Sequence, residues 1–393
     1  MTAFDYNAGF DELKESYLFT EVREKVRKFL DVNGGSVINL GVGDVAFPLP
    51  RSAVRAFVKA AVELGDNVRF RGYPEENGYA FLRKAISERY LKQGLCVGED
   101  EIFIGDGSKT DAASLPSVLG KADVLVCEPA YPVYPDAAAI NGNRVYYLKG
   151  SKQNGFFPSP ADAMPKPYVI WLCSPGNPTG AVITRPLLEE WVRFARQTGS
   201  LIIFDAAYAS FVEEGEVKSI YEVDGAREVA VELFSFSKYA GFTNLRCSWT
   251  VIPREITVKG KRLNELWKRR QSVFFNGVSY PVQRAAEAVI SGSGEAECMA
   301  IIERYKRNAR VIGEALSARG VWYTGGKSSP YIWLECPSGT SSREMFKILL
   351  EQARIVGTPG CGFGPSGEGY FRLSCFLKES DASVAAERLY KTF

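Results

Sequence analysis

The hydrophobic and polar positions of the chain follow two alternating patterns over its central part. Short runs such as "VLVCE", "VIWLC" and "LIIFD" are apolar at nearly every position, and most lead through a turn into a segment with apolar residues at helical spacing. A run of this kind is typical of a parallel strand buried on both faces. The pattern therefore predicts an α/β fold, with helices on both faces of a doubly wound, mostly parallel sheet.

The two ends of the chain predict a second, smaller unit of mixed α+β structure. The elements expected outside the central part are helices at 17–32, 52–64 and 79–94, a short strand at 37–44, a helical stretch from 263 to 320, and small-domain segments at 330–336, 342–355 and 369–376. We therefore expect a large domain at 46–280. A small domain would be formed by 1–45 and 281–393, with an N-terminal arm.

Composition narrows the class of protein. The 393 residues are 46% hydrophobic and 24% charged, so the chain can bury a large core without disulfides. A net charge of +2 gives no electrostatic case for nucleic acid or a membrane surface as a partner. The basic cluster at Lys259–Arg270 is expected to be a solvated helix face.

Cysteine usage and the apolar segments indicate the compartment. The eight cysteines form no CxxC pair, and most lie in apolar runs, which is typical of free thiols in a reducing compartment. The first residues lack the apolar segment of a secretory signal, and no apolar run is long enough to span a bilayer. We therefore expect a cytoplasmic location.

Histidine is absent from the chain. Its absence excludes mechanisms that need an imidazole, including Ser-His-Asp triads and His-ligated zinc, and we expect no metal site. Chemistry near neutral pH must then come from carboxylates, a lysine with an altered pKa, tyrosine or a bound cofactor.

Polar side chains stand directly after the predicted strands. They are Asp106, Ser108, Lys109, Tyr131, Asn177, Asp205, Tyr208 and Lys238. Because the carboxyl ends of strands in an open parallel sheet meet at one crevice, we expect these residues to converge there. Each also has an ordinary structural alternative. A strand-end Asp is commonly a turn or cap residue, and a loop lysine is commonly solvated.

Taken together, these residues predict a specific cofactor. A lysine in a water-poor site forms Schiff bases with aldehydes, and Asp205 could face a buried cation. The segment "GDGSKTD" offers backbone N–H groups at a helix N-terminus, and Ser235, Ser237 and Arg246 add donors for a phosphate. Pyridoxal 5'-phosphate unites these requirements. NAD and ATP are poor competitors, because neither a dinucleotide fingerprint nor a P-loop occurs.

Three further residues could complete such a site. Asn177, in the loop "CSPGNPTG", could bond a phenolate oxygen of the cofactor, although a plain tight turn is the alternative. Tyr131 could stack on the ring or be a packed loop aromatic. Arg372 lies in the apolar run "YFRLSC", where it needs an anionic partner, either a substrate carboxylate or an internal carboxylate.

The motifs "SFSKYAGF", "SPGNPTG" and "DAAY" resemble those of the class I/II aminotransferases, which are fold-type I pyridoxal 5'-phosphate enzymes. Further motifs run in order over nearly the whole chain, including "INLGVGD", "RGYPEENG", "EPAYPVY", "FNGVS" and "GYFRLS". In this order they resemble the LL-diaminopimelate aminotransferase group. The combined order is specific for the group, and less so for the substrate.

The resemblance implies a role for each matching residue. Lys238, Asp205 and Tyr208 would be catalytic, with Lys238 holding the cofactor covalently. The residues implied to bind the cofactor are Tyr73 (from a partner subunit), Ser108, Lys109, Tyr131, Asn177, Asp205, Tyr208, Ser235, Ser237, Lys238 and Arg246. Those implied to bind substrate are Tyr17, Gly43, Glu76, Lys109, Tyr131, Asn177, Asn276 and Arg372. A homodimer is implied, because Tyr17, Tyr73, Glu76 and Asn276 match residues contributed across a subunit interface.

The expected reaction is the interconversion of LL-diaminopimelate and tetrahydrodipicolinate with 2-oxoglutarate and glutamate, in lysine biosynthesis. Glu76 suits a second ammonium group at the distal end of the substrate, and the adjacent Glu75 is the alternative. The competing hypotheses are transamination of lysine or an aromatic amino acid, a pyridoxal 5'-phosphate β-lyase or decarboxylase, and a degenerate binding protein. Asn244, Ser248, Gly176 and Ser108 depart from the residues usual at these positions.

Overall fold

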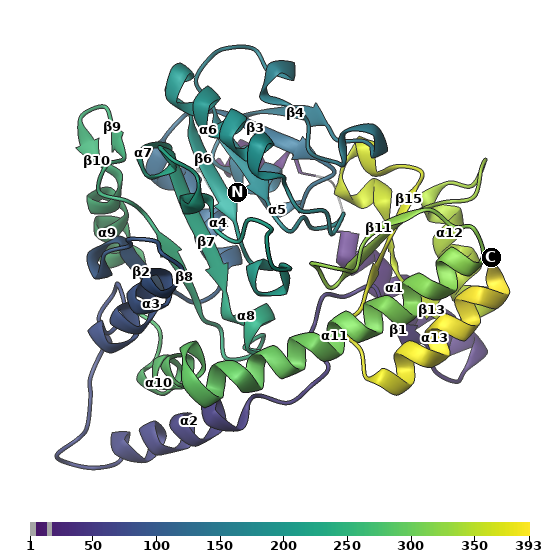
Figure 1. Cartoon of the computed structure of the whole chain (residues 1–393), viewed down its shortest axis with the longest axis horizontal. Helices are drawn as coiled ribbons and strands as arrows, with labels where there is room; N and C mark the ends of the chain where they lie inside the picture. The colour runs from purple at the N-terminus through teal and green to yellow at the C-terminus, as the bar shows by residue number, and fades with distance from the viewer. Residues whose placement is uncertain (1–4, 14–17) are drawn as a thin grey trace.

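The centre of the molecule is a seven-stranded sheet with the order β2-β8-β7-β6-β5-β3-β4 (Figure 1). The computed structural model describes residues 5–13 and 18–393. The strands of this sheet are β2 (Ile102–Gly105), β3 (Asp123–Glu128), β4 (Arg144–Lys149), β5 (Val169–Cys173), β6 (Leu201–Asp205), β7 (Ala230–Ser235) and β8 (Ser248–Val251). β8 runs antiparallel to both neighbours, and the other pairs are parallel. The predicted α/β fold is confirmed.

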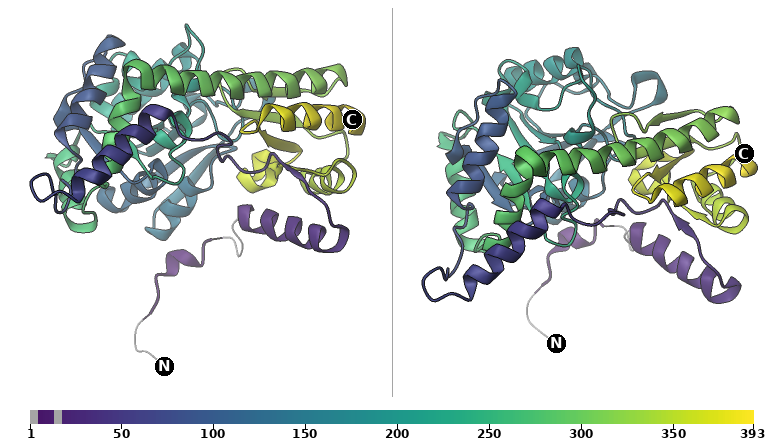
Figure 2. Two further views of the ribbon diagram at one scale, coloured as in Figure 1. Left: turned by 90° about the horizontal axis from the view of Figure 1, so that it is seen from below. Right: turned by 60° about the horizontal axis from the view of Figure 1, so that its bottom comes forward.

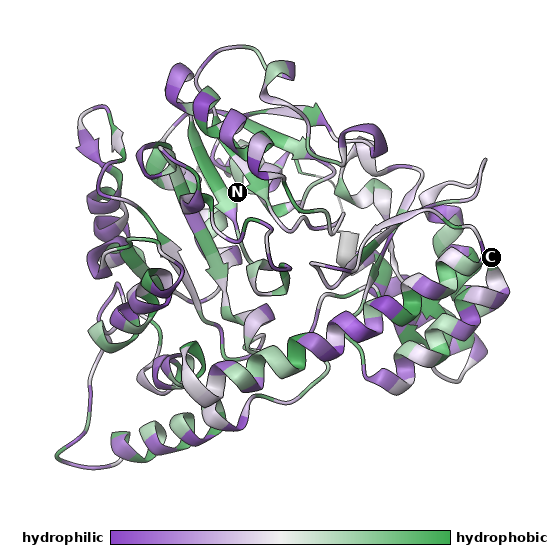
Figure 3. Cartoon of the chain, viewed as in Figure 1, coloured by the Kyte–Doolittle hydropathy of each residue, from purple (hydrophilic) through white to green (hydrophobic). Residues whose placement is uncertain are grey.

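Side chains alternate between the two faces of this sheet, as the period of a strand requires. Ile202 and Phe204 pack into one core, and Ile203 packs into the other. Helices close both cores, and hydrophilic and hydrophobic positions alternate along most of them (Figure 3). The helices around the sheet are α2 (Arg51–Leu64), α3 (Ala80–Lys92), α4 (Ser108–Leu119), α5 (Val133–Ile140), α6 (Arg185–Thr198), α7 (Ala226–Val229), α8 (Phe236–Tyr239), α9 (Leu263–Phe274) and α10 (Tyr280–Ile290).

A smaller antiparallel sheet with the order β11-β12-β15-β14 lies at the other end of the molecule (Figure 1). Its strands are β11 (Tyr323–Gly325), β12 (Tyr331–Glu335), β14 (Thr358–Pro359) and β15 (Tyr370–Ser374). The helices near it are α1 (Leu18–Asn33), α12 (Ser342–Ile348) and α13 (Glu379–Thr392) (Figure 2). Two short pairs complete the strands, β1 (Ile38–Asn39) with β13 (Ile355–Val356), and β9 (Thr257–Val258) with β10 (Lys261–Arg262).

One long helix, α11 (Gly292–Ala318), connects the two sheets. Cys298, Ile302 and Tyr305 pack into the core of the large sheet. Further along, Ile312 and Leu316 pack into the core of the small sheet. The helix is therefore shared by both cores, and the domain division at residue 280 stays a prediction.

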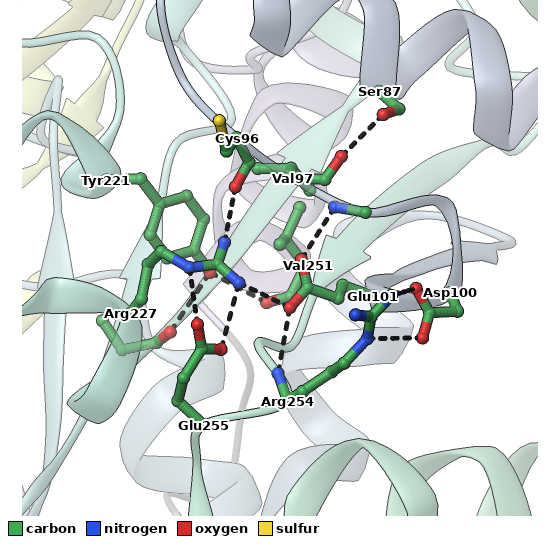
Figure 4. Close-up of polar contacts among 12 residues, drawn as sticks. Ser87, Cys96, Val97, Asp100, Glu101, Tyr221, Arg227, Val251, Arg254 and Glu255 are labelled. Carbon is green, nitrogen blue, oxygen red and sulfur yellow. Dashed lines mark hydrogen bonds and ion pairs between the residues drawn. The ribbon is translucent and has the colours of Figure 1, made fainter.

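An ion-pair cluster around Arg227 holds the antiparallel edge of the large sheet (Figure 4). Arg227 donates to Glu101 at 2.6 Å, to Glu255 at 2.9 Å and to the backbone carbonyl of Cys96 at 2.7 Å. Glu101 is 2% exposed and also accepts from the backbone N–H of Arg254 at 3.0 Å. The cluster thus joins the start of β2 to the segment after β8.

Several expectations about individual elements need correction. β4 and β8 were not predicted, and the strand expected at 37–44 is reduced to Ile38–Asn39. The helical stretch expected from Leu263 is three helices, because the backbone turns between Phe274 and Tyr280 and again at Ser291. Pro281 lies in the first turn of α10, where its missing N–H costs no helical hydrogen bond.

The basic cluster on α9 is a solvated helix face for Lys268 and Arg269, as predicted. Arg270 differs, because it is half-buried over the ring of Trp267 and donates to Ser114 at 2.6 Å. All eight cysteines are free thiols, as expected, and Cys96 is exposed. Over residues 5–13 and 18–393, no helix combines the length and apolar character needed to cross a membrane.

Candidate active site

A cavity of about 370 Å³ opens where the large-sheet strands end at their carboxyl termini and where β15 of the small sheet approaches. Twelve of the sixteen predicted site residues line it. They are Gly43, Ser108, Lys109, Tyr131, Asn177, Asp205, Tyr208, Ser235, Ser237, Lys238, Arg246 and Arg372. The convergence expected from the strand ends is therefore observed, although these residues span most of the chain.

Three of the other four predicted residues do not line this cavity within one chain. Tyr73, Glu76 and Asn276 are exposed on the surface, with 88% of Tyr73 accessible. Their segments adjoin, because a Cβ on Gly277 would collide with the backbone carbonyl of Glu75. Tyr17 lies outside the described residues.

Lys238 is the amine at the centre of the cavity. It lies in the short helix α8 directly after β7, and its Nζ donates to the backbone carbonyl of Gly43. Its pKa is lowered to about 8, mainly by burial; Asp44 opposes the shift, and the nearby cations Arg372 and Arg246 contribute to it. The amine is thus partly neutral near physiological pH, which a nucleophilic lysine needs.

Asp205 is the last residue of β6 and is 7% exposed. Its Oδ2 accepts from the hydroxyl of Tyr134 at 2.5 Å, and its Oδ1 accepts from the backbone N–H of Ala207 at 3.0 Å. Burial raises its pKa, and these two hydrogen bonds act in the opposite direction. A carboxylate held in this way is suited to a cationic partner inside the cavity.

Arg372 enters the cavity from β15 of the small sheet and is 1% exposed. Its Nη1 donates to Asn177 Oδ1 at 2.6 Å, and its Nη2 donates to the carbonyl of Gly41 at 2.7 Å and to the hydroxyl of Thr358 at 3.3 Å. A buried guanidinium with a planar fork of donors is suited to binding a carboxylate.

Hydroxyl, backbone and guanidinium donors gather at one end of the cavity. Arg246 Nη1 donates to Ser237 Oγ at 3.2 Å, and the backbone N–H of Ser237 donates to Ser235 Oγ at 3.2 Å. Ser108 begins α4, so the positive end of that helix faces the same place. Gly107 has a φ of +129°, and a Cβ there would collide with the Arg246 guanidinium. These donors suit an oxyanion such as phosphate.

Ser248, which departs from the residue usual at its position, bonds to the segment that forms this end of the cavity. Its hydroxyl accepts from the N–H of Gly107 at 3.1 Å and donates to Asp111 Oδ2 at 2.8 Å. Burial raises the pKa of Asp111 to about 6. The serine thus connects the start of β8 to the first turn of α4.

Sequence reasoning missed several residues of the site. Tyr134 and Tyr331 line the cavity, and the hydroxyl of Tyr331 lies 2.7 Å from that of Tyr208. Thr358 holds Arg372. The position of Tyr134, three residues after Tyr131 in a helix that follows a strand, was a usable signal. No comparable signal marks Tyr331, because it begins an ordinary apolar strand.

A family model described as aminotransferase class I and II matches residues 35–389. The chain belongs to the class I and II aminotransferases. LL-diaminopimelate aminotransferase of Prochlorococcus marinus (strain MIT 9515) is 43% identical to it over 98% of both proteins. The structure of L,L-diaminopimelate aminotransferase from Chlamydomonas reinhardtii matches with a TM-score of 0.94 and 37% identity over 99% of each chain.

A more distant structure, aspartate aminotransferase from Thermus thermophilus with maleate, has a TM-score of 0.87 at 22% identity over 99% of this chain and 100% of that one. At this identity the likeness bears on the fold alone. The aminotransferase is therefore an enzyme of the fold-type I class, as predicted. Its substrates are amino acids and 2-oxo acids.

Aminotransferases of this family depend on pyridoxal 5'-phosphate. The donor set of the cavity fits that cofactor. A partly neutral amine at Lys238 suits an aldehyde, the buried carboxylate of Asp205 suits a pyridinium nitrogen, and the donors around Gly107 and Arg246 suit a phosphate.

Proposed function

We propose that the protein is an LL-diaminopimelate aminotransferase, which exchanges an amino group between LL-diaminopimelate and 2-oxoglutarate. The observation that carries the proposal is the full-length similarity to LL-diaminopimelate aminotransferases, together with a cavity that holds Lys238, Asp205 and Arg372. Lysine biosynthesis is the process in which such a reaction would serve.

Two residues would control the reacting end of the cofactor. Bound pyridoxal 5'-phosphate supplies an electron sink for the bonds at the substrate Cα. Lys238 would hold the cofactor covalently through Nζ, and its amine would move the proton at the substrate Cα. Asp205 would keep the ring nitrogen protonated, because a buried carboxylate stabilises a cation beside it.

Other residues would orient the ring. Tyr208 and Asn177 would donate hydrogen bonds to its phenolic oxygen, and Tyr131 would stack on its face. Ser108, Lys109, Ser235, Ser237 and Arg246 would bind or line the phosphate, a placement that the hydroxyl and guanidinium donors there support. Tyr73 from a partner subunit would add to this end.

Arg372 would bind the α-carboxylate of the substrate through its planar fork of donors. Its guanidinium is buried and already oriented by Asn177 and Gly41, so little rotamer entropy would be lost on binding. Gly43 and Asn276 would lie near the same end of the substrate.

The distal end of the substrate would be recognised by Glu76, with Tyr17 and Lys109. A carboxylate there would favour a second ammonium group. Glu75, the alternative, already has an ion-pair partner, since its Oε2 lies 3.5 Å from Nη2 of Arg83. This pairing favours Glu76 as the residue that contacts substrate.

A homodimer would allow the exposed residues Tyr73, Glu76 and Asn276 to reach the cavity of a partner subunit. Val54, Val58 and Val62 lie four residues apart on one face of α2, and each is at least 44% exposed. Phe70 and Phe274 are exposed as well, at 67% and 72%. Exposed apolar side chains of this kind are suited to a subunit contact, which would deliver Tyr73 and Glu76 to the other cavity.

The domain division and the compartment also stay proposals. The large domain would comprise 46–280, and the small domain 1–45 and 281–393, with Arg372 carried by the small one. Eight free thiols support a reducing compartment such as the cytoplasm.

A donor comparison tests the proposed function. Purified holoenzyme would be assayed with 2-oxoglutarate and LL-diaminopimelate, lysine or an aromatic amino acid as donor. We expect LL-diaminopimelate to have the highest kcat/KM. Equal or better use of lysine or an aromatic donor would replace the proposed substrate, and elimination or decarboxylation products would replace the reaction.

A charge-removing pair of variants tests the distal contact. Glu76→Gln should lower kcat/KM for LL-diaminopimelate by about 10- to 100-fold, because a hydrogen bond to a charged group is lost, and should change glutamate turnover little. Glu75→Gln is the matched control and should affect both donors little. Equal losses on both donors in Glu76→Gln would remove the distal role.

A further inference from the structure

A hydrogen bond between two buried phenols crosses from one sheet to the other inside the cavity. The hydroxyls of Tyr208 and Tyr331 lie 2.7 Å apart, and either can be the donor. Tyr208 follows β6 of the large sheet, whereas Tyr331 is the first residue of β12 in the small sheet. Only 6% and 2% of these residues are exposed, so no bulk water competes for the bond.

The ring of Tyr331 lies beneath the guanidinium of Arg372. The Cζ atom of Arg372 is 4.5 Å from the ring centroid, within range of a cation–π interaction. The pairing of β12 with β15 produces this contact, because Tyr331 pairs with Ser374, two residues from Arg372, and the three side chains share one face. The residue thus touches the arginine with its ring and Tyr208 with its hydroxyl.

The backbone of Gly43 lies against the hydroxyl of Tyr331 as well. A Cβ on Gly43 would collide with Oη of Tyr331, so only glycine leaves room for the phenol at this position. The carbonyl of Gly43 accepts from Lys238 Nζ. Tyr331 therefore lies where the carboxylate-binding, ring-binding and amine-bearing parts of the site meet.

We propose that Tyr331 is a positioning residue that couples the guanidinium of Arg372 to the hydroxyl of Tyr208. The inference rests on the proposed function, in which Arg372 binds the substrate carboxylate and Tyr208 bonds the phenolic oxygen of the cofactor.

The direction of the phenol pair follows from the proposed role of Tyr208. Burial raises the pKa of both phenols, and Arg372 opposes the rise at each of them. Either hydroxyl can donate in the structure, but in the proposed function Tyr208 gives its proton to the phenolic oxygen of the cofactor, which leaves Tyr331 as the donor between the two phenols. The proton of Tyr208 is then free for the cofactor oxygen, and its donation is strengthened by the bond that it accepts. Cys173 and Asp205 are the other titratable groups acting on Tyr331.

Spectroscopic titration of the holoenzyme tests this coupling. Tyr331→Phe keeps the ring under Arg372 and removes only the hydroxyl. We expect the pH midpoint of the visible absorbance of the bound cofactor to move upward by about 0.5 to 1 pH unit, because Tyr208 becomes a weaker donor. In a Tyr208→Phe background, the same change should give no further shift, since the coupling partner is gone.

The matched control is Tyr239→Phe. Tyr239 is also buried beneath an arginine, with Cζ of Arg89 at 4.9 Å, but its hydroxyl donates to the carbonyl of Val289 at 2.6 Å, away from the cavity. The Tyr239→Phe variant should leave the pH midpoint of the cofactor absorbance unchanged. An unchanged midpoint in Tyr331→Phe, or equal shifts with and without the Tyr208 hydroxyl, would overturn the inference. The titration uses no amino donor, so the substrate proposal can fail while this result stands.

Discussion

The hydroxyl of Tyr134 donates to Asp205 at 2.5 Å, and the ring of Tyr134 stacks on Trp171 with 4.4 Å between centroids. A chain without histidine has thus placed a phenol behind the carboxylate that we propose to face the cofactor. Burial alone would raise the pKa of Asp205, and this hydrogen bond opposes that rise. Tyr134 therefore helps to keep Asp205 ionised, as its proposed role beside the ring nitrogen would require.

Removing this hydroxyl tests its role. In Tyr134→Phe the pKa of Asp205 should rise, so the carboxylate is lost at higher pH and the acidic limb of the kcat profile moves upward. At neutral pH we expect kcat to fall by about tenfold, the worth of one hydrogen bond to a charged group. Steady-state kinetics across pH measures both effects.

Tyr90→Phe is the control for that variant. Tyr90 is another buried phenol, and it donates to Glu232 at 2.5 Å outside the cavity. Loss of the Tyr90 hydroxyl should lower the free energy of unfolding and leave the acidic limb of the kcat profile at the same pH. Identical pH profiles for the two variants would show that Tyr134 acts only by packing.

The pKa of Lys238 predicts how fast the apoenzyme captures its cofactor at different pH values. Only the neutral amine attacks an aldehyde, and burial lowers this pKa to about 8. Below pH 8 the amine is mostly protonated, so the rate constant should fall as pH decreases and reach a plateau above about pH 9. Stopped-flow absorbance after mixing apoenzyme with pyridoxal 5'-phosphate measures this rate. A midpoint near the ordinary lysine value of about 10.4 would contradict the desolvated site.

The ion-pair cluster of Figure 4 predicts a stability effect remote from the cavity. Arg227→Met leaves the buried carboxylate of Glu101 without its cation, so we expect the free energy of unfolding to fall by about 2–4 kcal/mol. Arg196→Met removes a pair in which both side chains are half-exposed, and it should cost less than about 1 kcal/mol. Thermal unfolding measures the stability of both variants. Equal losses of unfolding free energy would show that the buried ion pair contributes no more than the exposed one.

Much of the site could be predicted because parallel strands all end at one edge. Asp205, Asn177 and Lys238 each follow a strand that is apolar at nearly every position, so their convergence needed only the topology. The absence of histidine then restricted the chemistry. The resemblance supplied the residue roles that strand positions alone could not.

What could not be predicted depends on contacts between distant elements. Tyr331 begins an ordinary apolar strand, and its role appears only when β12 pairs with β15 and brings it under Arg372. β8 was missed because it is a four-residue strand that follows a loop rather than a helix. The roles proposed for Tyr73 and Glu76 would need a second subunit, which a single chain does not contain.

The central claim is that Lys238 holds pyridoxal 5'-phosphate covalently at the edge of the large sheet. Borohydride reduction of the holoenzyme, followed by proteolysis and mass spectrometry, locates the modified lysine directly. We predict that the cofactor mass is found on the peptide that contains Lys238 and that Lys238→Ala carries none. Modification of Lys109, the other lysine that lines the cavity, or full transaminase turnover by Lys238→Ala, would contradict the account.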